Sequence, residues 1–299
     1  MSIAITEDHR SLAETVRSYA DKRDVRGAAR ARLESIDDTA PEFWPEFAEL
    51  GWLGLHLPED VGGSGYGIDE LVVVVEELAR AVAPGPFVPS AIASAVIAAA
   101  GDDELRSRFL PGFADGSTVG AVALGGSATM SGATVSGDAG VVLCGGPVSV
   151  LLVPVGDDVA VLEVGDGVTI ESPPSLDPSR PSVRVTLNGA PATVMPGARR
   201  VLIDLARVIL AADAVGVARE CTEMGADYSK ERIQFGRPIA MYQAVKHHCA
   251  NMAVAAELAT SAVWDAARAA ATGGDQLTYA AAVAATLAAP AADLCANLT

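Results

Sequence analysis

The sequence predicts an α+β fold in three parts: a helical domain at residues 1–115, an antiparallel β domain at 116–196 and a second helical domain at 197–299. Two patterns predict this order. In the first and last parts, apolar residues recur three or four positions apart, as along one face of an amphipathic helix. In the middle part, short β-branched runs alternate with Gly, Pro, Asp and Ser, which is typical of strands joined by turns. A chain of 299 residues, 50% of them hydrophobic, can bury a substantial core.

Four helices are expected in the first part. Thr6 is a suitable N-cap, and the first helix carries the apolar stripe Leu12, Val16 and Tyr19. A second helix begins after Asp69 and carries the stripe Leu71, Val74, Val75, Leu78 and Val82. Shorter helices are expected at 90–100 and 102–110.

The segment between the first two of these helices, PEDVGGSGYG at 58–67, is rich in glycine and must be a loop. Backbone N–H groups of such a loop can bind a phosphate, and the same composition also suits a plain turn between helices. The spacing of the glycines favours the turn.

The middle part contains five candidate strands, at 119–124, 141–144, 148–155, 159–164 and 183–187. In the last of them, Val183, Val185 and Leu187 alternate with Arg184 and Thr186. Because successive side chains of a strand point to opposite faces, this strand has one buried face and one face in water.

The last part predicts long helices. The stripe of the first one is Val201, Leu205, Val208, Ile209, Ala212 and Val215, and the helix extends to Glu231. Gly236 and Pro238 interrupt it, because proline disfavours helical geometry in the residue before it. A second helix is expected from Tyr242 to Ala271, and a last helix continues to the end of the sequence.

Charge and composition exclude several classes of partner. The formal net charge of −17 disfavours nucleic acid and anionic membranes. No secretory signal or membrane-spanning segment is evident, so we expect a cytoplasmic protein. Four cysteines without C-x-x-C spacing predict neither zinc nor a disulfide framework. His247 and His248 are adjacent in a helix and point about 100° apart, so no metal site is expected.

The sequence lacks the motifs G-x-G-x-x-G, G-x-x-x-x-G-K-[ST], G-x-S-x-G and H-E-x-x-H. The strongest local feature is RIQFGRPI at 232–239, followed by Gln243. It places the Arg232 guanidinium and the Gln243 carboxamide on either side of a helix break, where both can converge on one polyanionic ligand. Alternatively, Arg232 forms a salt bridge with Glu231 or Asp227. Periodicity does not decide between the two.

Two segments resemble the acyl-CoA dehydrogenase family. The run ERIQFGRPIAMYQAVKHHCANMAV, which begins at Glu231, is similar to the family's R-x-x-F-G-x-x-I-x-x-x-Q segment. Residues 51–80, GWLGLHLPEDVGGSGYGIDELVVVVEELAR, are similar to its G-L-x-x-P-x-x-x-G-G … E-E-L-x-R stretch. The helix, β, helix order is also the family's layout, so the resemblance covers essentially the whole chain, with the C-terminal part of the last helical domain missing.

The resemblance implies an FAD-dependent enzyme of lipid metabolism that oxidises the Cα–Cβ bond of an acyl-CoA thioester. By this resemblance, Arg232 and Gln243 bind the pyrophosphate and adenosine end of an FAD held mainly by a neighbouring subunit, and Phe235 packs beside it. Asp204 and Arg207 match the family's D-x-x-R segment, which contacts the pantetheine and nucleotide arm of the CoA thioester.

Three departures from the family's pattern stand out. The family's flavin-ring residues lie in a T-E-x-x-x-G-S-D loop and a W-[IV]-[ST] strand. The corresponding segment here, ALGGSATMSGATVSGDAGVVLCGG at 123–146, has no Glu, Asp or Trp at those places. Ala206 occupies one family position of the catalytic base, and the other position lies beyond Thr299. No catalytic base is therefore assigned in this chain.

Three functions fit these residues. The first is one subunit of a heterotetrameric acyl-CoA dehydrogenase acting on steroid side-chain CoA thioesters, whose second subunit supplies the ring-binding loop and the carboxylate. The second is a homotetrameric enzyme whose C-terminus is absent from this sequence. The third is a non-catalytic scaffold or partner subunit with the same fold. The first is expected, because the neighbour-facing motif is kept and the ring-binding motif is lost.

Overall fold

The computed structural model describes residues 5–34 and 39–299. The chain divides into two compact units, each described by itself. The helical unit comprises Met1–Tyr19, Val72–Val82 and Arg207–Thr299. The mixed unit comprises Ala20–Leu71 and Ala83–Ala206. The three-part division at 115 and 196 stays a prediction.

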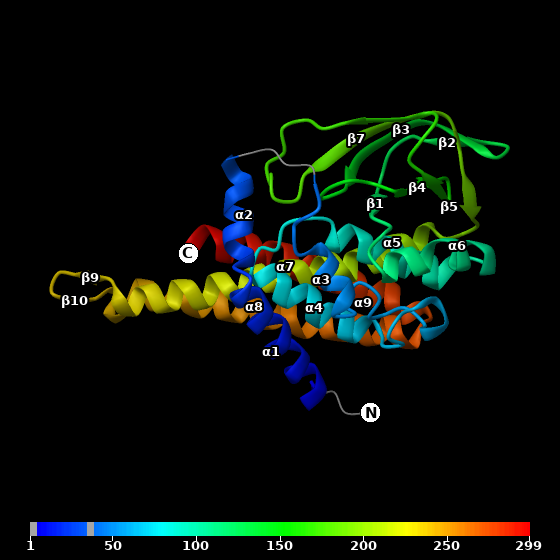
Figure 1. Cartoon of the computed structure of the whole chain (residues 1–299). Helices are drawn as coiled ribbons and strands as arrows, with labels where there is room; N and C mark the ends of the chain where they lie inside the picture. The colour runs from blue at the N-terminus through cyan, green and yellow to red at the C-terminus, as the bar shows by residue number, and fades with distance from the viewer. Residues whose placement is uncertain (1–4, 35–38) are drawn as a thin grey trace. The chain divides into compact units, whose positions relative to one another are not determined.

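The elements follow the predicted order of helices, strands and helices (Figure 1). The helices are α1 (Glu7–Lys22), α2 (Val25–Glu34), α3 (Trp44–Glu49), η1 (Glu59–Val61), α4 (Ile68–Arg80), α5 (Phe87–Ala100), α6 (Asp103–Ala114), α7 (Arg199–Glu231), η2 (Ile239–Met241), α8 (Gln243–Thr272) and α9 (Asp275–Leu298). The strands are β1 (Gly120–Ala123), β2 (Thr129–Ser131), β3 (Thr134–Leu143), β4 (Val150–Val155), β5 (Asp158–Glu163), β6 (Val168–Glu171), β7 (Ser182–Pro191), β8 (Thr193–Met195), β9 (Ile233–Gln234) and β10 (Arg237–Pro238).

The helical unit contains the two long predicted helices, α7 with 33 residues and α8 with 30. The predicted stripe of α7 is confirmed at five of its six positions, where the side chains are buried: Leu205, Val208, Ile209, Ala212 and Val215. Its first member, Val201, is half-buried. The predicted interruption at 235–238 is present, but the chain forms the two-stranded ribbon β9–β10 there instead of a plain break. Thr6 also caps α1 as predicted, because its Oγ1 accepts the N–H of His9 at 3.2 Å.

Helices α4 and α7 approach each other closely within the helical unit. A Cβ at Gly216 of α7 would clash with the carbonyl oxygen of Glu76 and would lie 2.7 Å from Cβ of Ala79. Beside this contact, Arg219 pairs with Glu76. Arg80 binds two carboxylates of α7, that of Glu223 at 2.5 Å and that of Glu220 at 2.9 Å. Backbone contact and ion pairs together fix α7 against α4.

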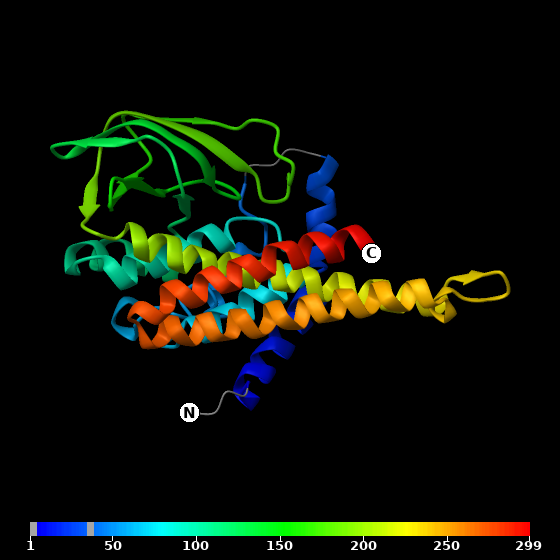
Figure 2. The ribbon, with the colours of Figure 1, turned by 180° about the vertical axis from the view of Figure 1, so that it is seen from behind.

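Helix α9 packs against α8, and both views show the two side by side (Figure 2). Several of its alanines are buried: Ala280, Ala281, Ala284, Ala288 and Ala291. By length and composition, α9 is apolar enough to cross a membrane, and 33% of its most apolar window is buried. A core helix meets the same criterion when it packs inside a protein.

The mixed unit is built on an eight-stranded sheet with the order β6-β7-β3-β1-β4-β5-β8, and β2 pairs with β3. The pairs are antiparallel as predicted, except that β1 runs parallel to β4. The alternation predicted for residues 183–187 is confirmed, because Val183, Val185 and Leu187 are buried. The parallel pair places β1 in the middle of the sheet, where its four residues are buried.

Helix α5 packs against β1 within this unit. The Ser90 hydroxyl of α5 accepts the N–H of Gly120 in β1 at 3.0 Å. A Cβ at Gly120 would lie 2.7 Å from Cβ of Ala93, so glycine permits the close approach of helix and strand.

The glycine-rich loop is a closed turn, as the spacing favours. The N–H groups of residues 62–67 all donate within the unit, to Glu59 O, Pro58 O, Gly54 O, Leu57 O, Leu55 O and Glu70 Oε2 in that order. Because these six donors are used, residues 62–67 have no backbone N–H group left for a phosphate.

His56 lies two residues before the start of this loop and is buried. Its Nε2 lies 3.0 Å from the hydroxyl of Ser94, which itself donates to the carbonyl oxygen of Ala91. Its Nδ1 has no partner among the described residues. Burial lowers the pKa of His56 to about 4, because the charged imidazolium would lose its hydration.

The Gly216 contact predicts opposite effects of alanine at two positions of α7. We expect G216A to lower the free energy of unfolding by about 1–3 kcal/mol, because its Cβ overpacks the contact with α4. G225A is the matched control, since the nearest atom to its Cβ would be Met252 Cε at 3.5 Å. There alanine raises stability by up to about 1 kcal/mol through helix propensity. Urea denaturation measures the free energy of unfolding of both variants. Equal changes in G216A and G225A would contradict the close contact at Gly216.

The buried His56 predicts acid sensitivity. Its pKa of about 4 in the folded chain lies below the unfolded value of 6.5, so only the unfolded chain binds the proton between these values. The contribution to stability is present above pH 6.5 and is lost as the pH falls toward 4. From pH 7 to 5 we expect a loss of about 2 kcal/mol that H56Q does not show. Equal pH dependence of the two proteins in urea denaturation would refute this assignment.

Candidate functional site

A short hairpin connects the two long helices of the helical unit. α7 ends at Glu231 and α8 begins at Gln243, and β9 and β10 pair between them (Figure 2). Arg237 pairs with Gln234 and Pro238 with Ile233. The Ile239 N–H donates to the carbonyl oxygen of Arg232 at 2.9 Å, which extends the ladder by one step.

The turn of this hairpin is strained and apolar at its tip. Phe235 and Gly236 have φ values of 51° and 78°. Two successive positive φ values suit a two-residue hairpin loop, but a bulky residue rarely adopts one. The Phe235 side chain is 93% exposed, with its ring 6.5 Å from that of Tyr242. Because its backbone is strained and its ring is exposed, Phe235 is a candidate binding residue.

Arg232 and Gln243 flank the hairpin, and both are exposed. Of the two acids considered as partners for Arg232, Asp227 pairs with Lys230 at 2.7 Å. Within the part of the chain that the structure describes, Arg232 has no ion pair. The salt-bridge alternative therefore loses its support, and a ligand with several negative charges fits the position. The first turn of α8 contains no acidic residue that would repel it.

Helix α7 also carries the residues predicted to contact the CoA arm. Asp204 is buried, with its Oδ2 3.8 Å from Nε of Arg200, whereas Arg207 is exposed. Ala206, at a family position of the base, is 1% exposed and cannot accept a proton. At 1.5 Å rise per residue, Arg207 lies about 36 Å along the helix from Glu231. The predicted cofactor and CoA residues therefore do not converge on one site in this chain.

In the segment expected to face a flavin ring, the residues after β1 pack against the backbone of β3. After β1, the N–H of Ser127 donates to the carbonyl oxygen of Asp138 in β3 at 2.7 Å. A Cβ at Gly126, with φ 114°, would lie 2.6 Å from that oxygen, and one at Gly137 would lie 2.9 Å from Ala128 Cα. Glycines are needed here for backbone contact, and the segment presents no Glu or Trp to a ligand.

FAD has two ends, and the residues present fit only one of them. The hairpin offers a guanidinium that has no ion pair within residues 5–34 and 39–299, a carboxamide and an exposed aromatic ring, which suit a pyrophosphate with an adenosine. The segment 123–146 lacks the side chains with which the family binds the ring.

A charged cavity of the helical unit is a poor alternative to the hairpin as a ligand site. It has a volume of about 290 Å³ and is lined by residues of α1, α4, α7 and α8. Two of its three carboxylates are already paired, Glu77 with Arg17 at 2.8 Å and Glu76 with Arg219. Burial raises the pKa of Glu76, whereas the hydrogen bond from Arg80 lowers the pKa of Glu223. These contacts hold α1, α4 and α7 together.

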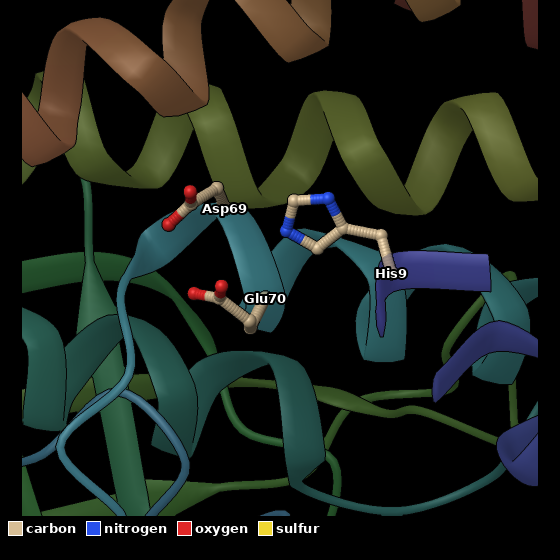
Figure 3. A group of neighbouring side chains, drawn as sticks. All are labelled: His9, Asp69 and Glu70. Carbon is tan, nitrogen blue, oxygen red and sulfur yellow. The ribbon is translucent and has the colours of Figure 1, made fainter. Parts of the chain in front are cut away.

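Figure 3 shows the side chains of His9, Asp69 and Glu70, and each of them is described within its own unit. His9 Nδ1 accepts the N–H of Thr6 at 3.3 Å, and its ring lies 5.0 Å from that of Trp264. Asp69 and Glu70 are in the first turn of α4, where acids are favoured by the helix dipole. The expectation of no metal site stays a prediction.

Comparison with known proteins decides the family. Residues 6–117 match the family profile "Acyl-CoA dehydrogenase, N-terminal domain", and residues 198–299 match "Acyl-CoA dehydrogenase, C-terminal domain". The chain belongs to the acyl-CoA dehydrogenase family. Family membership confirms the resemblance of the two quoted segments and the predicted fold class.

Individual relatives agree with this family assignment. The chain is 38% identical to acyl-CoA dehydrogenase FadE34 of Mycobacterium tuberculosis, over 96% of this chain and 41% of that protein. It is 29% identical to acyl-CoA dehydrogenase IpdE2 of Mycolicibacterium smegmatis, over 87% of this chain and 77% of that protein. It thus spans less than half the length of FadE34.

Solved structures extend the agreement to the fold. The structure of the Tcur3481-Tcur3483 steroid ACAD matches with a TM-score of 0.89 and 30% identity, over 98% of this chain and 85% of that chain. Butyryl-CoA dehydrogenase from Megasphaera elsdenii has the same fold, with a TM-score of 0.83, 21% identity and coverage of 99% and 88%.

The strain at Phe235 predicts a local effect of its replacement. Asparagine tolerates positive φ better than phenylalanine, and valine tolerates it less. We expect F235N to slow hydrogen exchange of the Ile239 amide about fivefold, which corresponds to about 1 kcal/mol of hairpin stability. F235V is the matched control and should accelerate the same exchange. If both variants exchange like the wild type, the backbone at 235 is not strained.

Proposed function

We propose that this chain is one subunit of a heteromeric, FAD-dependent acyl-CoA dehydrogenase that desaturates the Cα–Cβ bond of an acyl-CoA thioester in the cytoplasm. One observation carries the proposal: the hairpin exposes Arg232, Phe235 and Gln243, with no ion pair to Arg232 among the described residues, while the segment 123–146 lacks ring-binding side chains. The residues for the pyrophosphate and adenosine end of FAD are kept, and those for the flavin ring are absent from the segment 123–146.

The residues of this chain then act on the non-reacting end of the cofactor. Arg232 neutralises the pyrophosphate, Gln243 hydrogen-bonds the adenosine end and Phe235 packs beside it. When bound, FAD supplies the redox chemistry by accepting the β-hydride. Because Ala206 cannot accept a proton, the α-proton is removed by a carboxylate of the partner subunit.

Asp204 and Arg207 give the chain its contact with the substrate. Arg207 is exposed and can pair with a phosphate of the CoA nucleotide, whereas the buried Asp204 carboxylate can accept a hydrogen bond from the pantetheine arm. The similar structure is named as a steroid ACAD and carries the names of two proteins, Tcur3481 and Tcur3483. It supports both a two-subunit enzyme and a CoA thioester of a bulky steroid side chain as the substrate class.

A second candidate is a non-catalytic partner subunit with the acyl-CoA dehydrogenase fold. Ala206 favours it, since no base stands at that family position. Arg207 and Arg232 disfavour it, because a pure scaffold has no need of either residue. Arg232, beside the helix break, is exposed and has no ion pair among the described residues.

Flavin absorbance at 450 nm tests the proposal. The purified chain alone and the chain co-purified with a dehydrogenase subunit encoded beside it are compared after free FAD is removed. We expect flavin only in the mixed complex. Flavin bound by the lone chain would instead indicate a homomeric enzyme. No flavin in either sample would contradict the proposal and favour the non-catalytic partner subunit.

Two variants of the complex separate the roles. R232A should bind flavin about 10- to 150-fold more weakly, since it removes a charge-assisted contact worth about 1.5–3 kcal/mol. R207A is the matched control and should raise KM for the CoA thioester while flavin is retained. Unchanged flavin content in R232A would contradict the assignment of the hairpin.

A further inference from the structure

The hairpin lies in a stretch of unusual charge. The chain has 38 acidic residues and a net charge of −17, yet residues 232–256 contain no Asp or Glu. The same stretch contains three cations, Arg232, Arg237 and Lys246. All three are exposed. The region is therefore a local cationic surface on an acidic protein, which attracts an anionic ligand against the global field.

The strand register places two of these cations on one face. Arg237 pairs with Gln234, and Ile239 is opposite Arg232 through its hydrogen bond. Because side chains alternate along a strand and paired residues share a face, Arg232 and Arg237 are on the same side of the ribbon. They are diagonal neighbours, with Cα atoms about 7–8 Å apart, within reach of a common ligand.

Tyr242 holds the second guanidinium in place. Cζ of Arg237 lies 4.4 Å from the centre of the Tyr242 ring, in cation–π geometry. The Tyr242 hydroxyl donates to the carbonyl oxygen of Gln234 at 3.1 Å, which fixes the ring against the hairpin. Among the described residues, Arg237 has no ion pair, so its N–H donors are available to a ligand.

We propose that Arg237, stacked on Tyr242, is a second phosphate anchor beside Arg232, so that the hairpin selects a diphosphate over a monophosphate. This inference rests on the proposed function and deepens it, since it assigns a further residue to the pyrophosphate of the dinucleotide. Two guanidinium groups on one face match two adjacent phosphates. A guanidinium held flat by an aromatic ring loses less side-chain freedom on binding than a mobile one.

Titration with ADP and AMP tests this selectivity without the flavin ring. Isothermal titration uses the full chain in its complex with the partner subunit, stripped of flavin. We expect R237Q to weaken ADP binding about 10- to 100-fold and AMP binding less than threefold. R237K keeps the charge but not the planar donor pair, and Y242L removes the ring. Both should lie between the wild type and R237Q.

Controls separate failure of this inference from failure of the proposed function. R30Q, an exposed arginine of α2, should bind ADP like the wild type, and urea midpoints show that each variant is folded. If R232Q loses ADP while R237Q keeps wild-type affinity and selectivity, the second anchor is wrong and the proposed function stands. If the wild-type complex binds neither ADP nor FAD, both are wrong.

Discussion

The contact between α4 and α7 at Gly216 is the constraint on which the rest of the helical unit depends. Helix α7 begins before the predicted CoA residues and ends at the hairpin, so its placement determines where both are presented. A side chain at 216 would force the two backbones apart. The ion pairs of Arg219 and Arg80 with α4 and α7 carboxylates lie within two turns of this glycine and resist rotation of the helix.

A rigid α7 has a consequence for the site. The hairpin is presented at the end of a helix that is about 50 Å long. Arg232 and Arg237 are left exposed, on a chain that has enough acidic residues elsewhere to pair them. Neither guanidinium has an ion pair among the described residues. Exposed cations and a strained, exposed Phe235 make physical sense when a ligand and a second subunit cover them. The lack of ring-binding side chains in 123–146 also favours a second subunit that binds the flavin ring.

Much of this arrangement could be predicted from the sequence, and the missed parts have physical reasons. The long stripes of α7 and α8 repeat over several turns, so their helical period is unmistakable. Helix α3 was missed because its six residues, with Pro45 in the first turn, are too few for a period to show. Helix α2 was missed because Gly27 and four positions of arginine or glutamate leave only a weak apolar stripe. The parallel β1–β4 pair was missed because alternation reports which face is buried and not which strand is adjacent.

The candidate site was also predicted only in part from the sequence. Spacing and resemblance selected Arg232, Phe235 and Gln243, but not Arg237, because its role depends on hairpin register and on Tyr242 five residues later. The absence of acids from 232–256 is a sequence signal that could have drawn attention to it. Asp204 and Arg207 look equivalent in the sequence, and only the structure shows that one is buried and the other exposed.

The central claim is that one FAD is shared between this chain and a partner subunit. An experimental structure of the FAD-bound complex tests it most directly, through the distance from the Arg232 guanidinium to the FAD pyrophosphate and the identity of the chain that contacts the ring. The account predicts a hydrogen-bonding distance to Arg232 and a ring held by the partner. A ring held by residues 123–146 of this chain, or a pyrophosphate far from its hairpin, would contradict the account.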